Sequence, residues 1–557
     1  MKSPALFLPA FLLLSAASAF AQWQTTTYSL KGGWNAIHLS GDATYQPLET
    51  LLPTEVLEVW RWNPNPEQVQ FTESPLIPSA GTPEWSVWKR GDAANSSLSL
   101  LSGQASYLVK CSGTASNSYS VPILQSPRPP SNKWVRSGAN LMGFPAFQSG
   151  GSSPLMSSYF ASFPIATAAN TRIFKYVGGD LGAGNPLQIF SPASERLDRT
   201  KAYWFSADVV GNFYAPLEVS LSTEEGLTFG RSGSIVSARI RNRTSAPMSV
   251  TFSPVSSEAA PLGQQGITGP VPLTRRSFNT GAVQWEETPI TGAFQEVIAP
   301  QTTIEVSFGI DRASMASEPA DAYFASFLRL TDSGGLMDIY LPSSATKSSL
   351  AGLWIGDITL NQVSNASTAT GNTPASFPLR TLLHVADDGT ASLLSKVFIG
   401  KLAAGAHDLG ICTEESLLDS SSLATAQRLV AAHMPLDRVL SSGSGSVALG
   451  DTLTRTIQIP FNDPTNPFVH QYHPDHDNKN ARGQAVGAGV ESYNVTRTCT
   501  FTFTASPLPG SQPSGWGSNT LGGPYEETIT GLHRNPIKLT GTFELRRANE
   551  LGTLHLP

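Results

Sequence analysis

Three of the nine histidines in this 557-residue chain fall within seven consecutive residues, next to several aspartates. Imidazole nitrogens and carboxylate oxygens together suit zinc and other divalent first-row metals, whereas Asp475, Asp477 and Asn478 would suit calcium, which prefers oxygen ligands. The segment 462–478 therefore predicts a divalent metal site, for zinc or calcium. The candidate ligands are His470, His473, Asp475, His476 and Asp477.

The same segment has two other interpretations. Pro464, Pro467 and Pro474 exclude a regular helix, so its side chains come from a loop. One interpretation is a structural loop, in which Asp and His side chains hydrogen-bond to irregular backbone. The other is a catalytic centre, although the segment has no His-Glu-x-x-His motif and the chain has no Gly-x-Ser-x-Gly elbow. A glycosidase with two carboxylates also stays open, because its acids need not be close in sequence.

Aromatic residues near the N-terminus form a second group of candidates. Trp34, Trp60, Trp62 and Tyr107 would suit a platform on which a sugar ring stacks. The alternative is that they belong to the hydrophobic core, because some of them recur as aromatics at matching places further along the chain.

That recurrence belongs to an internal duplication. Gly33-Trp34-Asn35-Ala36 in residues 22–122 matches Gly138-Ala139-Asn140-Leu141 in residues 123–220, and the order of the following segments also matches. Each copy alternates apolar and polar residues with a period of two, which is typical of strands that bury one face. We expect two related small β domains in tandem.

Residues 221–346 have a different pattern, with strands expected at Ser234–Arg243, Met248–Phe252 and Ile298–Phe308 and a hairpin around 332–335. Short alternating strands with frequent turn signals predict a two-sheet sandwich. The segment resembles the bacterial immunoglobulin-like domains of the ASPM/hydin type. That resemblance implies a spacer or interaction module without catalysis.

Residues 347–557 predict a larger antiparallel β domain, a barrel or a sandwich, with one inserted helix at 423–434. The domain resembles the C-terminal part of large uncharacterised secreted proteins of environmental bacteria, in its Phe377-Pro378-Leu379-Arg380 segment and its Asn466-Pro467-Phe468 to Asn478 segment. That resemblance implies an architecture and no activity. The whole chain is expected to be all-β.

Residues 1–21 predict a signal peptide, with Lys2, an apolar run and the small residues Ala19 and Ala21 before cleavage at Gln22. The alternative, a membrane anchor, is disfavoured because the run is shorter than the ~20 apolar residues of a span. No later stretch is apolar for ~18 residues, so we expect no transmembrane anchor.

Of the three cysteines, Cys412 and Cys499 either pair or are buried thiols.

Composition restricts the function. Charged residues make up 14% of the chain, against about 25% in an average soluble protein. The chain has a net charge of −6 and no stripe of basic residues along its sequence, which excludes nucleic acid as a partner. We expect an exported protein of the extracellular space, cell surface or periplasm. It would be a non-enzymatic modular protein for binding, adhesion or envelope structure, with a cell-surface protein or carbohydrate as partner. The alternative is a metal-dependent hydrolase at 470–478.

Overall fold

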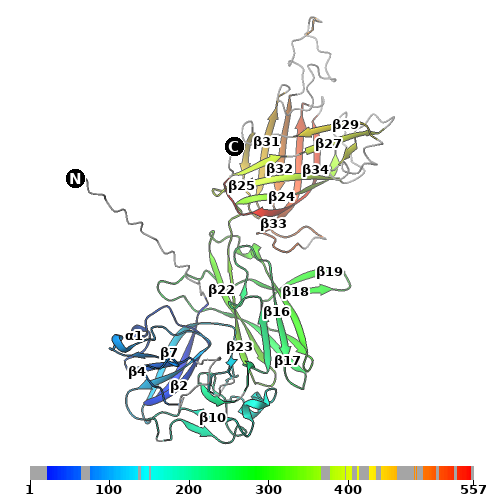
Figure 1. Ribbon diagram of the computed structural model, residues 1–557. Coiled ribbons are helices and arrows are strands. Elements are labelled where there is room, and N and C mark those ends of the chain that lie inside the picture. Colours follow the sequence, from blue (N-terminus) through cyan, green and yellow to red (C-terminus); the bar gives the residue numbers. More distant parts are fainter. Residues whose placement is uncertain are drawn as a thin grey trace, which may run out of the picture.

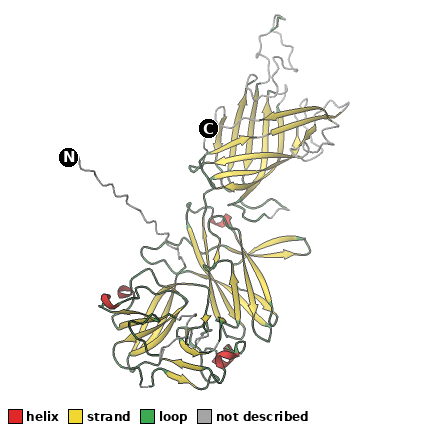
Figure 2. Ribbon diagram, viewed as in Figure 1, coloured by secondary structure: helices red, strands yellow, loops and turns green. Residues whose placement is uncertain are grey.

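The computed structural model confirms an all-β chain built from several antiparallel sheets (Figures 1 and 2). Its α-helices are two single turns in the N-terminal part of the described chain. The structure describes residues 22–63, 76–135, 139–149, 152–182, 184–207, 209–364, 377–395, 397–403, 410–412, 426–433, 441–460, 482, 484–485, 494–509, 513–531 and 536–553.

The first unit packs a three-stranded sheet against a four-stranded sheet. The first sheet has the order β1 (Gln24–Lys31), β7 (Ser118–Pro127), β3 (Gly41–Asp42). The second has the order β2 (Gly33–Leu39), β6 (Ala105–Cys111), β4 (Val56–Trp62), β5 (Trp85–Lys89), and helix α1 (Leu48–Leu51) lies beside them. The boundary expected after residue 122 falls inside β7, which continues to Pro127.

The second unit has a four-stranded sheet of order β11 (Leu187–Ile189), β10 (Arg172–Lys175), β12 (Tyr203–Ser206), β9 (Asn140–Met142). A short pair, β13 (Gly211–Asn212) with β8 (Lys133–Trp134), and helix α2 (Met156–Tyr159) complete it.

Matching hydrogen bonds recur in the two units. The side chain of Asn35 accepts from the Lys31 amide at 2.9 Å and donates to the Lys31 carbonyl at 2.7 Å. Asn140 makes the same two bonds with Val135, at 2.8 and 3.2 Å. Each asparagine side chain thus satisfies both the amide and the carbonyl of one residue that lies four or five positions earlier in the chain. The same pair of bonds thus occurs at matching places of the two units.

Two five-stranded sheets form the sandwich that follows. One has the order β14 (Leu217–Leu221), β16 (Ile235–Asn242), β21 (Thr303–Ile310), β18 (Leu273–Asn279), β19 (Gln284–Pro289). The other has the order β15 (Leu227–Thr228), β23 (Asp338–Thr346), β22 (Tyr323–Asp332), β17 (Met248–Ser256), β20 (Phe294–Ile298). Their facing side chains share one hydrophobic core with the second unit, so those two parts bury a single apolar interior.

An eight-stranded antiparallel sheet dominates the C-terminal part. Its order is β26 (Ala391–Ser395), β25 (Phe377–Val385), β24 (Gly352–Val363), β34 (Ile537–Asn549), β33 (Thr520–Thr530), β32 (Val495–Thr502), β31 (Thr452–Ile459), β30 (Ser441–Gly445). The guanidinium of Arg455 in β31 donates to the Ala391 carbonyl in β26, at 2.9 Å from Nε. Since these strands lie near opposite ends of the order, the sheet must curl strongly around its core.

The helix expected at 423–434 is wrong. Residues Ala426–His433 form strand β29, which pairs with β27 (Val397–Ala403) in a second sheet that also contains β28 (Gly410–Cys412). Alanine, glutamine, arginine and leucine favour a helix locally, but pairing with β27 satisfies the backbone instead. Tertiary pairing therefore overrides local propensity here.

Two further expectations concern the membrane and the cysteines. Within the described part of the chain, no helix is long and apolar enough to cross a membrane. Cys111 and Cys499 are both buried, and the two alternatives for Cys412 and Cys499 stay predictions.

Candidate functional site

The metal-ligand candidates cannot be placed by the structure. His470, His473, Asp475, His476 and Asp477 all lie outside the described residues. Among the residues that are described, no group of three or more His, Cys, Asp or Glu side chains is arranged to hold a metal ion. The predicted zinc or calcium site and its hydrolase alternative stay predictions.

The structure places the aromatic stacking candidates inside the protein. Trp34, Trp60 and Trp62 are 5–7% exposed and Tyr107 is fully buried. The three tryptophans lie on the face of the β2–β6–β4–β5 sheet that packs against the second unit, where Trp62 meets Trp204 at 5.3 Å between ring centroids. This placement favours their alternative interpretation as core residues that join the two units.

A cavity of about 440 Å³ lies where the sandwich meets the C-terminal part. We call it the hairpin cleft. One wall comes from the hairpin β18–β19 and the end of β21, and includes Thr274, Glu287 and Asp311. The opposite wall comes from residues 505–509 and 513–516, after β32, and includes Leu508 and Trp516. Figure 1 shows β18 and β19 extending from the body of the sandwich.

The hairpin register fixes which side chains share the cleft face. Thr274 lies opposite Pro289, Arg276 opposite Glu287, and Phe278 opposite Trp285. These pairs are two residues apart, so all six side chains lie on one face of the hairpin. Leu273, on the other face, is in the sandwich core. The lining residues Thr274, Glu287 and Pro289 therefore lie on the outer face of the sheet.

An exposed aromatic pair stands near the tip of this face. Phe278 and Trp285 are each 46% exposed, and their rings meet edge to face at 5.4 Å. The Arg276 guanidinium lies over the Trp285 ring, 4.6 Å from its centroid. Since β-strands rise about 3.4 Å per residue, Trp285 is about 7 Å along the strand from Glu287. The aromatic pair therefore lies further along the same hairpin face as Glu287, outside the cleft lining.

The cleft is acidic. Its described lining contains two carboxylates, Glu287 and Asp311, and no lysine, arginine or histidine. The cavity walls withdraw Glu287 from water and the Asp311 charge lies nearby, and both raise its pKa, while hydrogen bonding from Thr274 and the charge of Arg276 act in the opposite direction. The Thr274 hydroxyl donates to Glu287 Oε2 at 3.1 Å.

Asp311 has a different role from Glu287. Its Oδ1 accepts from the Ala313 amide at 3.1 Å and its Oδ2 accepts from the Ser314 hydroxyl. It therefore caps the 3-10 helix η3 (Arg312–Met315). Because both oxygens are engaged in this turn, the two carboxylates are not arranged as an acid and base facing one substrate.

The far wall is held rigidly. Trp516 is 9% exposed, and its indole nitrogen donates to the Thr504 carbonyl at 3.1 Å. Its ring lies on Gly522 in β33, where an added Cβ would come within 2.9 Å of the indole. Glycine at 522 thus lets the tryptophan lie flat against the curled sheet and line the cleft.

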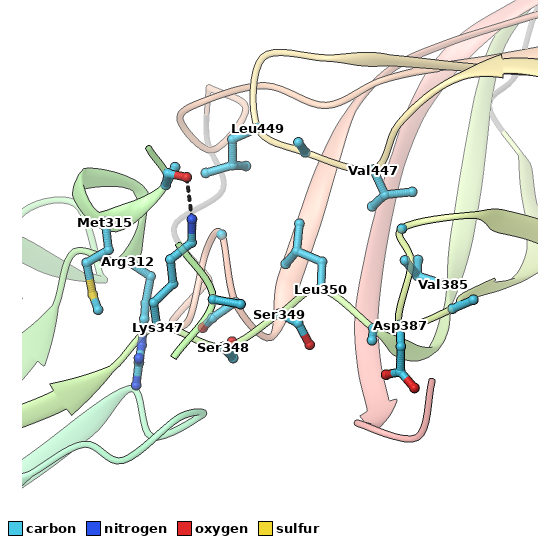
Figure 3. A pocket seen from close by; sticks show the side chains of 18 residues that line it. Arg312, Met315, Lys347, Ser348, Ser349, Leu350, Val385, Asp387, Val447 and Leu449 are labelled. Carbon is cyan, nitrogen blue, oxygen red and sulfur yellow. Dashed lines mark hydrogen bonds between the residues drawn. The ribbon is translucent and has the colours of Figure 1, made fainter. Parts of the chain in front are cut away.

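A second, smaller cavity of about 250 Å³ lies at the joint between the sandwich and the C-terminal sheet (Figure 3). This joint sets how the two walls of the hairpin cleft lie relative to each other. Arg312 and Lys347 line it from the sandwich, Val447 and Leu449 from the C-terminal sheet, and the linker 348–350 runs between them. Arg312 Nη2 donates to the carbonyls of residues 229, 230 and 233 at 2.8–3.2 Å, and Nη1 to that of residue 346 at 2.7 Å. These bonds anchor the sandwich side of the joint.

From the C-terminal side, Arg547 reaches back across the linker. Its Nη2 donates to Ser348 Oγ at 3.2 Å and to the carbonyls of Ser349 and Ser518 at 2.8 and 2.6 Å. Its guanidinium also lies over the Trp354 ring, 5.1 Å from the centroid. The joint is therefore a hydrogen-bonded contact, which positions residues 505–509 and 513–516 opposite the hairpin.

Sequence reasoning missed Trp285, Phe278, Glu287 and Trp516. One signal was available: the 273–289 segment alternates, and its outward positions carry two aromatics where a solvated sheet face normally carries polar residues.

Comparison with known proteins leaves the function open. No family model matches the chain, and no curated protein matches it. Two solved structures from Bacteroides ovatus, both described as of unknown function, are similar at 12% and 11% identity with TM-scores of 0.18 and 0.14. Each alignment covers 60% of this chain, and 95% and 96% of the respective neighbour.

Proposed function

We propose that this chain is an exported, non-enzymatic modular protein that binds an extracellular ligand through the hairpin cleft and its aromatic pair, in adhesion or envelope structure. One observation carries the proposal: Phe278 and Trp285, each 46% exposed, share a sheet face with a cavity of about 440 Å³. Binding sites for small ligands are typically cavities of about 300–1,000 Å³ with apolar walls and few polar groups. Exposed aromatics beside such a cavity are typical of recognition surfaces.

The rest of the chain supports binding rather than turnover. Asp311 is engaged as a helix cap, so Glu287 has no arranged catalytic partner in the described lining. The resemblance of residues 221–346 to ASPM/hydin-type immunoglobulin-like domains implies an interaction module. The signal peptide expected at 1–21 implies export, and the cell surface, extracellular space or periplasm as the place of binding.

The test is retention of the purified chain, residues 22–557, on insoluble envelope and extracellular-matrix material from bacterial cultures. We expect saturable retention that Trp285→Ala weakens and Leu262→Ala does not. Leu262 is the matched control because it is also an exposed apolar residue, at 98%, and lies away from the cleft lining. A fluorescence unfolding curve should be the same for both variants.

Two results would count against the proposal. Retention that is equal in wild type and Trp285→Ala would remove the cleft face as the binding surface. Saturable hydrolysis of a substrate, abolished by His473→Ala, would instead favour the metal-dependent hydrolase at 470–478.

A further inference from the structure

The charge of the hairpin cleft restricts what it can hold. Glu287 and Asp311 line it, and the Arg276 guanidinium, opposite Glu287 on the same face, offsets one of these two negative charges. An anionic ligand such as a phosphate, sulfate or uronate would meet two carboxylates at short range in a partly water-excluded cavity, which costs free energy. The remaining negative charge therefore disfavours an anionic ligand.

The geometry of the aromatic pair restricts the class of ligand further. Phe278 and Trp285 meet edge to face, with an angle of 68° between the rings, so they form a corner and not a flat platform. A cationic group already lies over Trp285, because the Arg276 guanidinium is 4.6 Å from the centroid of that ring. A second cation placed against the same pair would be repelled by this guanidinium, whereas the C–H face of a neutral sugar ring would not.

The polar groups of the surface suit hydroxyl groups. Glu287 accepts hydrogen bonds, and one of its oxygens already receives the Thr274 hydroxyl at 3.1 Å. A polyol carries many O–H donors and an apolar C–H face. It therefore matches a surface on which a carboxylate that accepts hydrogen bonds lies near apolar rings.

Resting on the binding function proposed above, we infer that the ligand is a neutral glycan chain. One sugar occupies the hairpin cleft, with its hydroxyls donating to Glu287 and its ring against Trp516. The chain continues along the hairpin so that a following sugar packs in the corner of Phe278 and Trp285, about 7 Å further along the strand.

The experiment measures binding of residues 22–557 to defined oligosaccharides by calorimetry. The neutral probes are hexasaccharides of glucose with β-1,4, β-1,3 and α-1,4 linkages, of xylose, of mannose and of N-acetylglucosamine. Hexagalacturonate serves as the acidic probe and hexalysine as the basic probe. We expect at least one neutral hexasaccharide to bind, with an affinity that changes less than about twofold between 0.05 and 0.5 M salt, because no ion pair forms.

The variants separate the two parts of the surface. Trp285→Ala and Phe278→Ala should each weaken neutral glycan binding at least about tenfold, as removal of an aromatic anchor does at other interfaces. Glu287→Gln keeps an acceptor and loses the charge, so we expect a change of only a few fold. Leu262→Ala and Val297→Ala, both exposed apolar residues outside the cleft lining, should bind as wild type does.

Two outcomes overturn the inference in different ways. If hexalysine binds in a salt-dependent manner that Trp285→Ala weakens, while the neutral glycans do not bind, the ligand class is wrong but the cleft remains a binding site. If no probe binds, and retention on envelope material is also insensitive to Trp285→Ala, both the glycan inference and the proposed function are wrong.

Discussion

His38 should make the stability of the N-terminal part depend on pH. It is 5% exposed, in β2, where its Nδ1 lies 3.1 Å from the Ser106 hydroxyl. It lines a cavity of about 30 Å³ together with Arg128, Arg199 and Asp338, which is room for about one water molecule. Burial lowers the pKa of His38 to about 4, and the Arg199 charge acts in the same direction.

The size and sign follow from linkage. The unfolded chain has a histidine pKa near 6.5, so between pH 6.5 and 4 the unfolded state binds a proton that the folded state does not. Stability is therefore fully present above pH 6.5, falls as the pH decreases through this window, and levels off below pH 4. The whole loss is about 3 kcal/mol, of which about 2 kcal/mol is reached at pH 5.

The assay is urea unfolding followed by tryptophan fluorescence between pH 4.5 and 8. Eight of the eleven tryptophans precede residue 221, so this signal mainly reports the two N-terminal units. His38→Gln should remove about 2 kcal/mol of the difference between pH 7.5 and pH 5. Ser106→Ala is the control, because it removes the hydroxyl partner but keeps the buried imidazole, and it should keep the wild-type pH dependence.

One result would refute this reasoning: an equal loss of stability between pH 7.5 and pH 5 in wild type and His38→Gln. That result would mean that the imidazole is hydrated or paired when protonated, so that burial does not exclude its charged form.

Three further predictions concern other parts of the chain. Arg497 and Glu527 form a fully buried ion pair in the C-terminal core; Glu527→Gln should cost about 3–5 kcal/mol in urea unfolding, and the double change to Met and Leu should recover part of it. Asn35→Ala and Asn140→Ala should each cost about 1–3 kcal/mol, because each leaves backbone groups without a partner, and equal costs in the same unfolding assay would support the duplication. If the predicted metal site exists, elemental analysis should find stoichiometric zinc or calcium that His473→Ala removes, and a chelator should lower the Tm; absence of metal would leave the structural-loop interpretation.

The strands could be predicted well because each is decided locally. The strand expected at Ser234–Arg243 is β16, and the expected hairpin around 332–335 joins β22 to β23. Alternation with a period of two and turn residues between strands are sufficient for this. The segment at 426–433 was missed because its residues favour a helix and only a distant strand, β27, makes it extended.

The site could not be predicted because alternation says which residues share a sheet face but not what covers that face. Trp60 and Trp285 both lie on outer faces of sheets, yet the second unit buries Trp60 to 5% exposure while Trp285 stays 46% exposed. Covering is decided by docking between units, which involves residues far apart in sequence. The two walls of the hairpin cleft are similarly separated, at 274–313 and 505–516.

This separation bears on the role of the sandwich. A spacer, one of the two roles that the resemblance to ASPM/hydin-type domains implies, would contribute length and leave recognition to its neighbours. Here the hairpin β18–β19 supplies one wall of the cleft and both exposed aromatics, while the curled sheet supplies Trp516. The position of the wall that contains Trp516 depends on the joint, where Arg547 hydrogen-bonds to the linker 348–350. If the cleft binds as proposed, recognition belongs to the docked pair of domains, and neither domain alone would carry the site.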